Sequence, residues 1–352
     1  MIQRILSHIA DDESKFLFSK KIESIILNQP ILFTEALLET NHQWEFDKKD
    51  DLTAIMETSN PICICGAGYC GKQTYLLLKK FGLDCRVAFF IDNDPEKQGK
   101  QLYGREIKSF LDIDINILSD ILFLIATNSR NAGEIYAQLM NVYTIPLSHI
   151  ICPRSGHIRA WTGQQYFDVF APNSHEIFVD AGASYGSTSV AFVNWTNDDY
   201  DGIYAFDPRI NADKYYSEML TRYNLKNAQF FSKGLWSSNT TLQFIENASG
   251  SCIADTGNNK VQVVSLDDIL SNNRVSFIKM DIEGSELEAL KGSKHIIMQY
   301  HPRLAISIYH KPEDIVSIPS YILHLYNHYR FIIRVYSSDG LETVLYAIPN
   351  AD

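Results

Sequence analysis

The stretch "EIFVDAGASYGSTSVAFVNW", residues 176–195, runs from an apolar segment through a glycine-spaced turn into a helical pattern. A strand, a glycine turn and a helix in this order present backbone N–H groups at the helix N-terminus, which favours an anion or a nucleotide-like ligand. The earlier stretch "PICICGAGYCGKQTY", residues 61–75, has the same order of apolar segment, glycine-spaced turn and helical pattern. The chain therefore predicts two glycine loops, each lying between a strand and a helix.

Strand-like and helix-like segments alternate after each loop. "VAFFIDND" and "ILFLIAT" follow the first loop, whereas "GIYAFDP", "VSFIKMDIEG" and "RLAISIYH" follow the second, with helical patterns between them. Such alternation predicts βαβ units and parallel sheets. "TTLQFIEN" and "KVQVVSLDDIL" are typical of an inserted hairpin, and the tail "YRFIIRVYSSDGLETVLYAI" predicts an antiparallel pair of strands joined through Asp339 and Gly340.

These patterns predict an α/β protein with two tandem Rossmann-like doubly wound sheets. A chain of 352 residues that is 45% hydrophobic is long enough for two cores. We expect a helical N-terminal segment at 1–59, a Rossmann-like domain at 60–150 whose ligand these patterns do not identify, a connector at 151–174 and a second domain at 175–352.

Composition and charge narrow the class of partner. No apolar run approaches the length of a membrane span, and the N-terminus "MIQRILSHIADDESKF" becomes charged early, so we expect a cytoplasmic protein with no transmembrane segment. The formal net charge of −11 repels phosphate backbones. This favours a small-molecule or saccharide partner over a nucleic acid.

The six cysteines show no CxxC pair, so we expect reduced thiols. Cys63, Cys65 and Cys70 are spaced closely enough to consider a metal site. Strand alternation instead predicts that Cys63 and Cys65 share one buried face, as core residues.

The two glycine loops differ in spacing. The first is Gly66-x-Gly68-x-x-Gly71, the dinucleotide pattern, whereas the second is Gly182-x-x-x-Gly186 preceded by Asp180. An acid at the next strand end, Asp92 or Asp207, lies 21 residues after the last glycine of each loop and is placed for ribose hydroxyls. A carboxylate such as Asp180 beside the turn opposes a pyrophosphate and suits a cationic ligand such as S-adenosylmethionine.

The second half of the chain resembles the FkbM family of S-adenosylmethionine-dependent methyltransferases. The resemblance rests on "QYFDVFAPNSHEIFVDAGASYGSTS", "IYAFDP", "SKGLWSSNTTLQF", "SLDDIL", "FIKMDIEGSELEALKG" and "LAISIYHKPEDIVSIPSYI". It implies a class I methyltransferase fold and O-methylation, often of sugars in glycans or natural products. The chain reads "FDP", with Asp207 at the centre, where "FEP" is expected in this family, and it has Tyr185 where an acid is frequent. The cofactor-binding residues are then Asp180, Gly182, Ala183, Ser184, Tyr185, Gly186, Asp207 and Asp281.

The acceptor side is expected at the ends of later strands, because ligands of open α/β sheets lie at the carboxyl ends. Candidate catalytic residues are Asp281 and Glu283 after one strand and His310 after the next, with His310 as general base through its ordinary pKa near 6.5. The same three residues are an alternative divalent-metal site for magnesium or manganese. Ser285-x-x-Glu288 is typical of a capping box.

The first glycine loop has its own candidate ligand. Gly66, Gly68 and Gly71 fit the phosphates of NAD or another nucleotide, and Asp92 fits a ribose and opposes the 2′-phosphate of NADP. No redox catalytic set follows the loop, so a nucleotide or nucleotide-sugar platform and a scaffold without ligand stay open beside an oxidoreductase.

Overall fold

The structure is a computed structural model of the chain. It describes residues 1–350 apart from 41–42, 47–48, 114–117, 119, 128–131, 133–134, 137, 141, 152–157, 162–163, 246–251, 254–256, 258 and 338–339. The chain forms two compact units. The C-terminal unit comprises residues 1–19, 163–334 and 342–352, and the N-terminal unit comprises residues 20–162 and 335–341.

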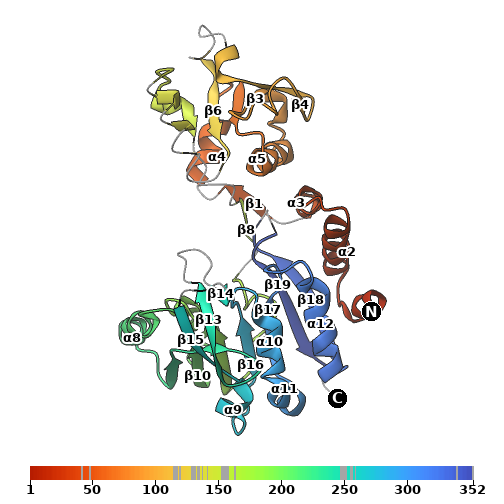
Figure 1. Ribbon diagram of the computed structural model, residues 1–352, viewed down its shortest axis with the longest axis vertical. Helices are drawn as coiled ribbons and strands as arrows, with labels where there is room; N and C mark the ends of the chain where they lie inside the picture. Colours follow the sequence, from red (N-terminus) through yellow and green to blue (C-terminus); the bar gives the residue numbers. More distant parts are fainter. Residues whose placement is uncertain are drawn as a thin grey trace. The chain divides into compact units, whose positions relative to one another are not determined.

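A seven-stranded sheet forms the centre of the C-terminal unit (Figure 1). The strand order is β11-β10-β9-β16-β17-β19-β18, and β19 runs antiparallel to β17 while the strands from β11 to β17 are parallel. The strands are β9 (Glu176–Ala181), β10 (Tyr200–Phe206), β11 (Ala228–Phe231), β16 (Phe277–Met280), β17 (Arg303–Ser307), β18 (Tyr329–Val335) and β19 (Thr343–Pro349). From β9 the chain adds β10 and β11 on one side, and it adds β16 and β17 on the other side, so the strand order reverses between β9 and β16. A ligand site is therefore expected at the carboxyl ends of these two strands.

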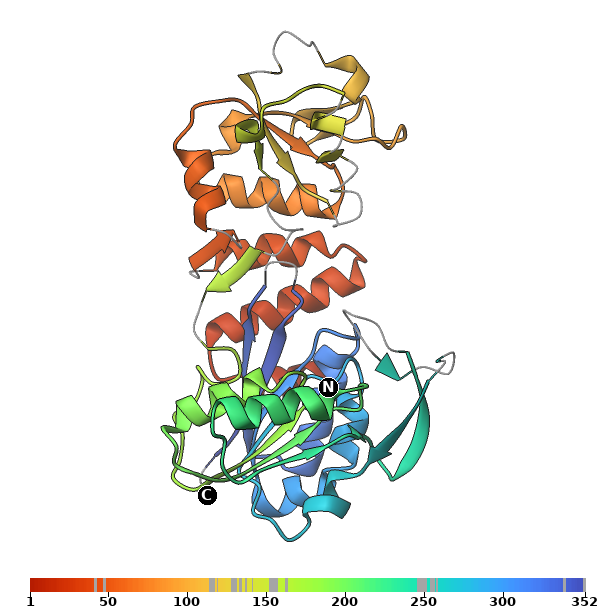
Figure 2. The same ribbon diagram turned by 90° about the vertical axis from the view of Figure 1, so that its left-hand side faces the viewer.

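Helices cover both faces of this sheet (Figure 2). They are α7 (Ser187–Thr196), α8 (Ala212–Arg222), α9 (Leu266–Leu270), α10 (Glu286–Lys291), α11 (Lys294–Tyr300), α12 (Asp314–Leu325) and α1 (Ile2–His8). β16 and β17 are buried along their whole length because helices pack on both sides of them. An aromatic cluster of Phe167, Phe178, Phe192 and Phe277 fills the core beside β9.

A small four-stranded sheet follows β11 in the same unit. It contains β12 (Gly234–Leu235), β13 (Thr240–Ile245), β14 (Cys252–Ile253) and β15 (Asn259–Val264). β13 and β15 pair antiparallel, as the predicted hairpin requires, and β14 pairs with the other edge of β13.

The N-terminal unit is built on a six-stranded sheet of order β4-β5-β3-β2-β6-β7. Its strands are β2 (Ile62–Cys65), β3 (Val87–Ile91), β4 (Gln101–Leu102), β5 (Arg105–Lys108), β6 (Leu122–Ile125) and β7 (Ile150–Ile151). Only the pairing of β4 with β5 is antiparallel among the described strand pairs of this sheet. The first glycine loop joins β2 to α5 (Tyr69–Lys80). This unit also contains α2 (Asp12–Ile26), which starts in the C-terminal unit, α3 (Ile31–Glu39), α4 (Lys49–Met56), and the pair β1 (Gln43–Phe46) and β8 (Ile158–Trp161).

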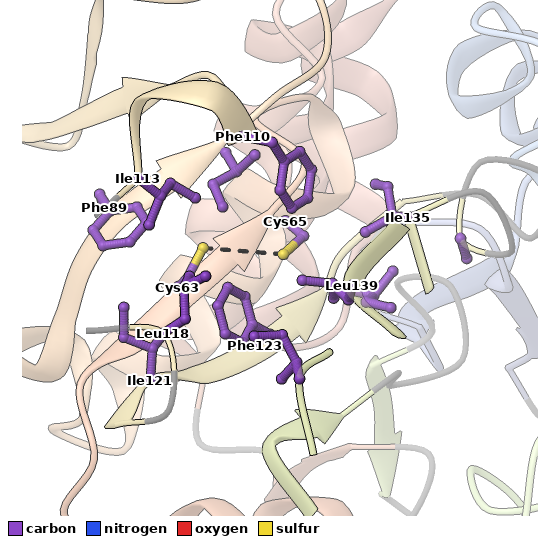
Figure 3. Close-up of a cluster of buried hydrophobic side chains, with 14 residues drawn as sticks. Cys63, Cys65, Phe89, Phe110, Ile113, Leu118, Ile121, Phe123, Ile135 and Leu139 are labelled. Atoms are coloured by element: carbon purple, nitrogen blue, oxygen red, sulfur yellow. Dashed lines mark hydrogen bonds between the residues drawn. The ribbon is translucent and has the colours of Figure 1, made fainter. Parts of the chain in front are cut away.

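Cys63 and Cys65 lie in the core of the N-terminal unit (Figure 3). Both side chains are fully buried among Phe89, Phe110 and Phe123, and their sulfur atoms are 4.0 Å apart. Burial and the neighbouring Cys65 thiol raise the pKa of Cys63, which keeps it a neutral thiol. The two residues therefore pack as small hydrophobic side chains, as strand alternation predicts.

The α/β class is confirmed. Within the described part of the chain, no helix is long and apolar enough to cross a membrane. The predicted turn residue Asp339 and the connector residues 152–157 lie outside the described residues. The domain limits predicted for a nucleotide-binding domain and a methyltransferase domain remain proposals.

Candidate cofactor and acceptor site

The second glycine loop connects β9 to α7 through a backbone turn that requires glycine at its first position. Gly182 has φ +78°, and a Cβ atom placed there would lie 1.9 Å from the carbonyl oxygen of Asp281. No side chain fits that distance. The loop is thus held directly against the end of β16, and the Gly182 loop and the β16 end form one continuous surface.

Asp180 is fully buried beneath this loop. Its carboxylate accepts hydrogen bonds from Ser189 Oγ at 2.8 Å and from Lys279 Nζ at 3.2 Å. The Lys279 ammonium also donates to the carbonyl oxygens of Ala181 and Gly182. The pair therefore anchors the loop from inside, and the buried Asp180 carboxylate is bonded to Ser189 and Lys279.

Asp207 at the end of β10 has all four of its acceptor positions occupied. Oδ1 accepts from the Arg209 backbone N–H and Nε, both at 3.0 Å, and Oδ2 accepts from the Ser184 N–H at 2.8 Å and Arg209 Nη2 at 2.9 Å. A carboxylate offers about four such positions. The two backbone bonds shape the loop, whereas the two side-chain bonds occupy the positions that ribose hydroxyls would need.

Tyr185 extends outward from the loop and is 58% exposed. The Arg209 guanidinium lies 5.7 Å from its ring centroid, and the Tyr215 ring packs edge-on against it at 5.2 Å. This aromatic and cationic edge lies where the family resemblance led us to expect an acid.

Asp281 follows β16 and is held by two phenols. Tyr166 donates to Oδ2 at 2.9 Å and Tyr309 donates to Oδ1 at 3.2 Å, while the Asp281 side chain stays 25% exposed. Burial and the Asp281 charge raise the pKa of both tyrosines, so they remain hydrogen-bond donors. Asp281 is therefore oriented but still open on one side.

His310 follows β17 and is surrounded by carboxylates. Its Nε2 lies 3.6 Å from Asp281 Oδ1 and 3.4 Å from Glu283 Oε2, and its Nδ1 lies 3.0 Å from the buried Glu286 Oε1. Burial opposes the charged ring, but the carboxylates of Glu283, Glu286 and Asp281 outweigh it and raise the pKa of His310 to about 10. The ring therefore carries a proton at neutral pH, and the ordinary pKa on which its role as a free base depended does not hold in this conformation.

The model of the Methyltransferase FkbM domain family matches residues 180–333. This range begins at Asp180 beneath the glycine loop and contains the strand ends that carry Asp207, Asp281 and His310. Residues 180–333 form an FkbM methyltransferase domain. The family implies S-adenosylmethionine as the methyl donor.

The chain is also similar to several solved structures. A structure of methyltransferase FkbM from Methylobacillus flagellatus KT aligns over 92% of this chain and 99% of its own, with 19% identity and a TM-score of 0.49. An rRNA methylase from Streptococcus thermophilus aligns over 52% and 90%, with 15% identity and a TM-score of 0.35. A Streptococcus mutans protein solved in complex with SAH aligns over 51% and 92%, with 14% identity and a TM-score of 0.34. No curated protein matches the chain.

The structure brings the predicted residues of the FkbM domain together at one edge of the sheet. The Gly182 loop contacts the Asp281 carbonyl, and Asp207 binds the Ser184 N–H of the same loop. Glu283 reaches His310 from a turn in which its own backbone has φ +55°. Such left-handed non-glycine residues concentrate at functional sites.

One smaller prediction is wrong. α10 begins after Ser285 as expected, but the Ser285 side chain makes no capping hydrogen bond, and Glu288 pairs with Lys291. Lys279 at the end of β16 is 2% exposed and bound to Asp180.

Sequence reasoning missed three contributors to the site, namely Tyr166, Glu286 and Arg209. Tyr166 belongs to the block "QYFDVF" that supports the family resemblance, so its position was signalled but its contact with Asp281 was not. Glu286 has no signal, because a helix-initial glutamate is ordinarily exposed whereas this one is fully buried.

The glycine loop of the N-terminal unit borders a cavity of about 520 Å³. A Cβ atom on Gly68 would meet nothing within 4 Å, whereas one on Gly71 would lie 1.9 Å from the Gly66 carbonyl oxygen. Asp92 accepts the Ala67 N–H at 2.8 Å and pairs with Lys97 at 3.1 Å. The loop thus packs tightly on the helix side and is open at Gly68, where a ligand could approach the loop backbone.

Proposed function

We propose that the chain is an S-adenosylmethionine-dependent O-methyltransferase that transfers a methyl group to a hydroxyl of a saccharide or a related glycan or natural-product precursor. The single observation that carries the proposal is the contact of the Gly182 loop with the Asp281 carbonyl oxygen, which brings the candidate cofactor loop and the candidate acceptor groups onto one surface.

On the cofactor side, Gly182, Ala183, Ser184, Tyr185 and Gly186 line the methionine and ribose region, and Asp207 takes the ribose hydroxyls. Asp180 acts from below, because its buried pair with Lys279 fixes the carbonyl oxygens of the loop. Ribose binding at Asp207 requires the Arg209 side chain to move aside, which frees two acceptor positions for two hydroxyls.

On the acceptor side, Asp281, Glu283 and His310 hold the hydroxyl in line with the donor methyl group. Methyl transfer is an in-line displacement, so the acceptor oxygen must lie about 3 Å from the methyl carbon and lose its proton. Glu283 is the carboxylate of this set with the greatest exposure at 42%, and it is placed to take that proton while the charged His310 fixes its position.

Methyl transfer from radiolabelled S-adenosylmethionine to a panel of monosaccharides and nucleotide sugars tests the proposal. We expect product with at least one saccharide, loss of turnover in the His310→Ala variant, and an S-adenosylhomocysteine affinity within about threefold of wild type in that variant. His324→Ala, an exposed change in α12, is the control and should keep full turnover. Label transferred to RNA or protein but to no saccharide would contradict the proposed substrate class.

A second function, nucleotide binding at the N-terminal unit, is favoured by the cavity beside Gly66, Gly68 and Asp92. Its ligand would be NAD or a nucleotide sugar, with phosphates at the open side of Gly68 and a ribose at Asp92. Calorimetry with NAD, NADH and UDP-glucose tests it. Binding that disappears in Asp92→Asn but persists in Asp207→Asn would support this function, and absence of binding by all three ligands would reject it.

A further inference from the structure

The acceptor side leaves buried polar atoms without hydrogen bonds. Glu286 is fully buried and the His310 side chain is 9% exposed. Among the described residues, neither Glu286 Oε2 nor either His310 ring nitrogen has a hydrogen-bond partner. The ion-pair contacts of His310 with Glu286 and Glu283 lack hydrogen-bond geometry. Buried polar groups are nearly always satisfied, so three unsatisfied atoms in one cluster need an explanation.

The same cluster has the separations of a metal coordination shell. Asp281, Glu286 and His310 each offer one ligand atom, and these atoms all lie within 4.8 Å of one another. Metal–ligand bonds of about 2.1 Å place neighbouring ligands about 3 Å apart and opposite ligands about 4.2 Å apart. Because Glu286 faces Nδ1 and Asp281 faces Nε2 of the same ring, the imidazole must turn, or one carboxylate must move around its edge, for all three to share one ion.

Charge favours a cation at this position. Asp281, Glu283 and Glu286 supply three carboxylates against the single His310 ring. The nearby Lys279 ammonium is bonded to Asp180 and to the backbone carbonyls of Ala181 and Gly182. Even a protonated His310 leaves the cluster with excess negative charge, which a divalent ion would offset.

We propose that Asp281, Glu286 and His310 form a binding site for a divalent cation of the Mn²⁺ class. Two carboxylates with one imidazole suit manganese, because carboxylate and water ligands favour hard ions whereas the imidazole favours ions softer than magnesium. Glu283, which is 42% exposed and 3.4 Å from His310 Nε2, can close the site from the solvent side.

The use of such a cation rests on the proposed function, whereas its binding does not. A cation bound to His310 would displace the ring proton into solvent, and it would bind the acceptor hydroxyl and lower the pKa of that hydroxyl. The site would then orient an acceptor without a free imidazole base.

Electron paramagnetic resonance of Mn²⁺, titrated with the full chain in the absence of cofactor and acceptor, tests the site. We expect one equivalent of Mn²⁺ to bind, and His310→Gln and Glu286→Gln each to weaken that binding at least tenfold. His175→Gln is the matched control, because His175 also pairs with an aspartate, Asp201, at 3.0 Å but is exposed, and it should leave the affinity unchanged.

Circular dichroism of each variant establishes that it is folded. If Glu286→Gln does not fold, Glu283→Gln replaces it and should weaken Mn²⁺ binding at least threefold. No bound Mn²⁺ in the wild type, or equal affinity in the wild type and His310→Gln, would overturn the proposal. Calorimetry with S-adenosylhomocysteine in parallel separates the two questions. A chain that binds Mn²⁺ but does not bind S-adenosylhomocysteine would keep the cation site and reject the proposed cofactor site.

Discussion

Replacing Arg209 with alanine should tighten the binding of S-adenosylhomocysteine. The Arg209 side chain donates Nε at 3.0 Å and Nη2 at 2.9 Å to the two Asp207 oxygens that a ribose would use. The ligand must therefore displace these two hydrogen bonds before it forms its own.

The size of the effect follows from the exposure of the pair. Hydrogen bonds to charged groups contribute about 1.5–3 kcal/mol when buried, whereas exposed ion pairs contribute about 0–1 kcal/mol. Asp207 is 4% exposed and Arg209 is 29% exposed, so we take a displacement cost of about 1–2 kcal/mol, between these limits. That range corresponds to binding about 5- to 30-fold tighter in Arg209→Ala.

Isothermal calorimetry with S-adenosylhomocysteine measures this change without the positive sulfonium, whose repulsion from Arg209 would complicate the comparison. Arg222→Ala is the control, because the Arg222 guanidinium also lies over a tyrosine ring, 5.6 Å from the Tyr223 centroid, but is not bonded to Asp207. Its affinity should match the wild type. Unchanged or weaker binding in Arg209→Ala would refute the competition between Arg209 and the ribose.

Three further predictions follow from buried contacts. Lys279→Met should lower the free energy of unfolding by about 3–5 kcal/mol, because it leaves the Asp180 charge buried and unpaired. Urea unfolding measures this loss, and the double variant with Asp180→Asn should recover part of it. A loss below about 1 kcal/mol would contradict the anchoring role. Gly182→Ala should cost at least about 3 kcal/mol through its positive φ and its collision with the Asp281 carbonyl, measured by the same unfolding, and a wild-type stability would show that the loop does not contact β16 in this way. Gly71→Ala should destabilise the N-terminal unit in thermal melting, whereas Gly68→Ala should not, since a Cβ meets the Gly66 carbonyl at the first position and open space at the second; equal effects would contradict the packing of this loop.

Local patterns were enough to place the strand ends. Apolar runs before Gly66 and Gly182 predict the two strands, and the acid positions Asp92 and Asp207 follow because strand, turn and helix have restricted lengths. The same reasoning places Asp281 and His310 at the carboxyl ends of neighbouring strands, where the structure has them.

Contacts between distant segments could not be predicted in this way. Lys279 pairs with Asp180 because β16 lies beside β9 in a register that sets these two residues opposite each other, and no periodicity reveals that register. Tyr166 reaches Asp281 across 115 positions of sequence. The high pKa of His310 depends on the buried Glu286 as well, so a strand-end histidine could be located from sequence while its protonation state could not.

A crystal structure of the chain with S-adenosylhomocysteine tests the central claim most directly. We predict the ligand against the Gly182 loop, its ribose hydroxyls within hydrogen-bond distance of Asp207, and the Arg209 guanidinium moved off that carboxylate. Density for the ligand at the Gly66 loop, or a Gly182 loop left empty at saturating ligand with Arg209 still on Asp207, would contradict the account.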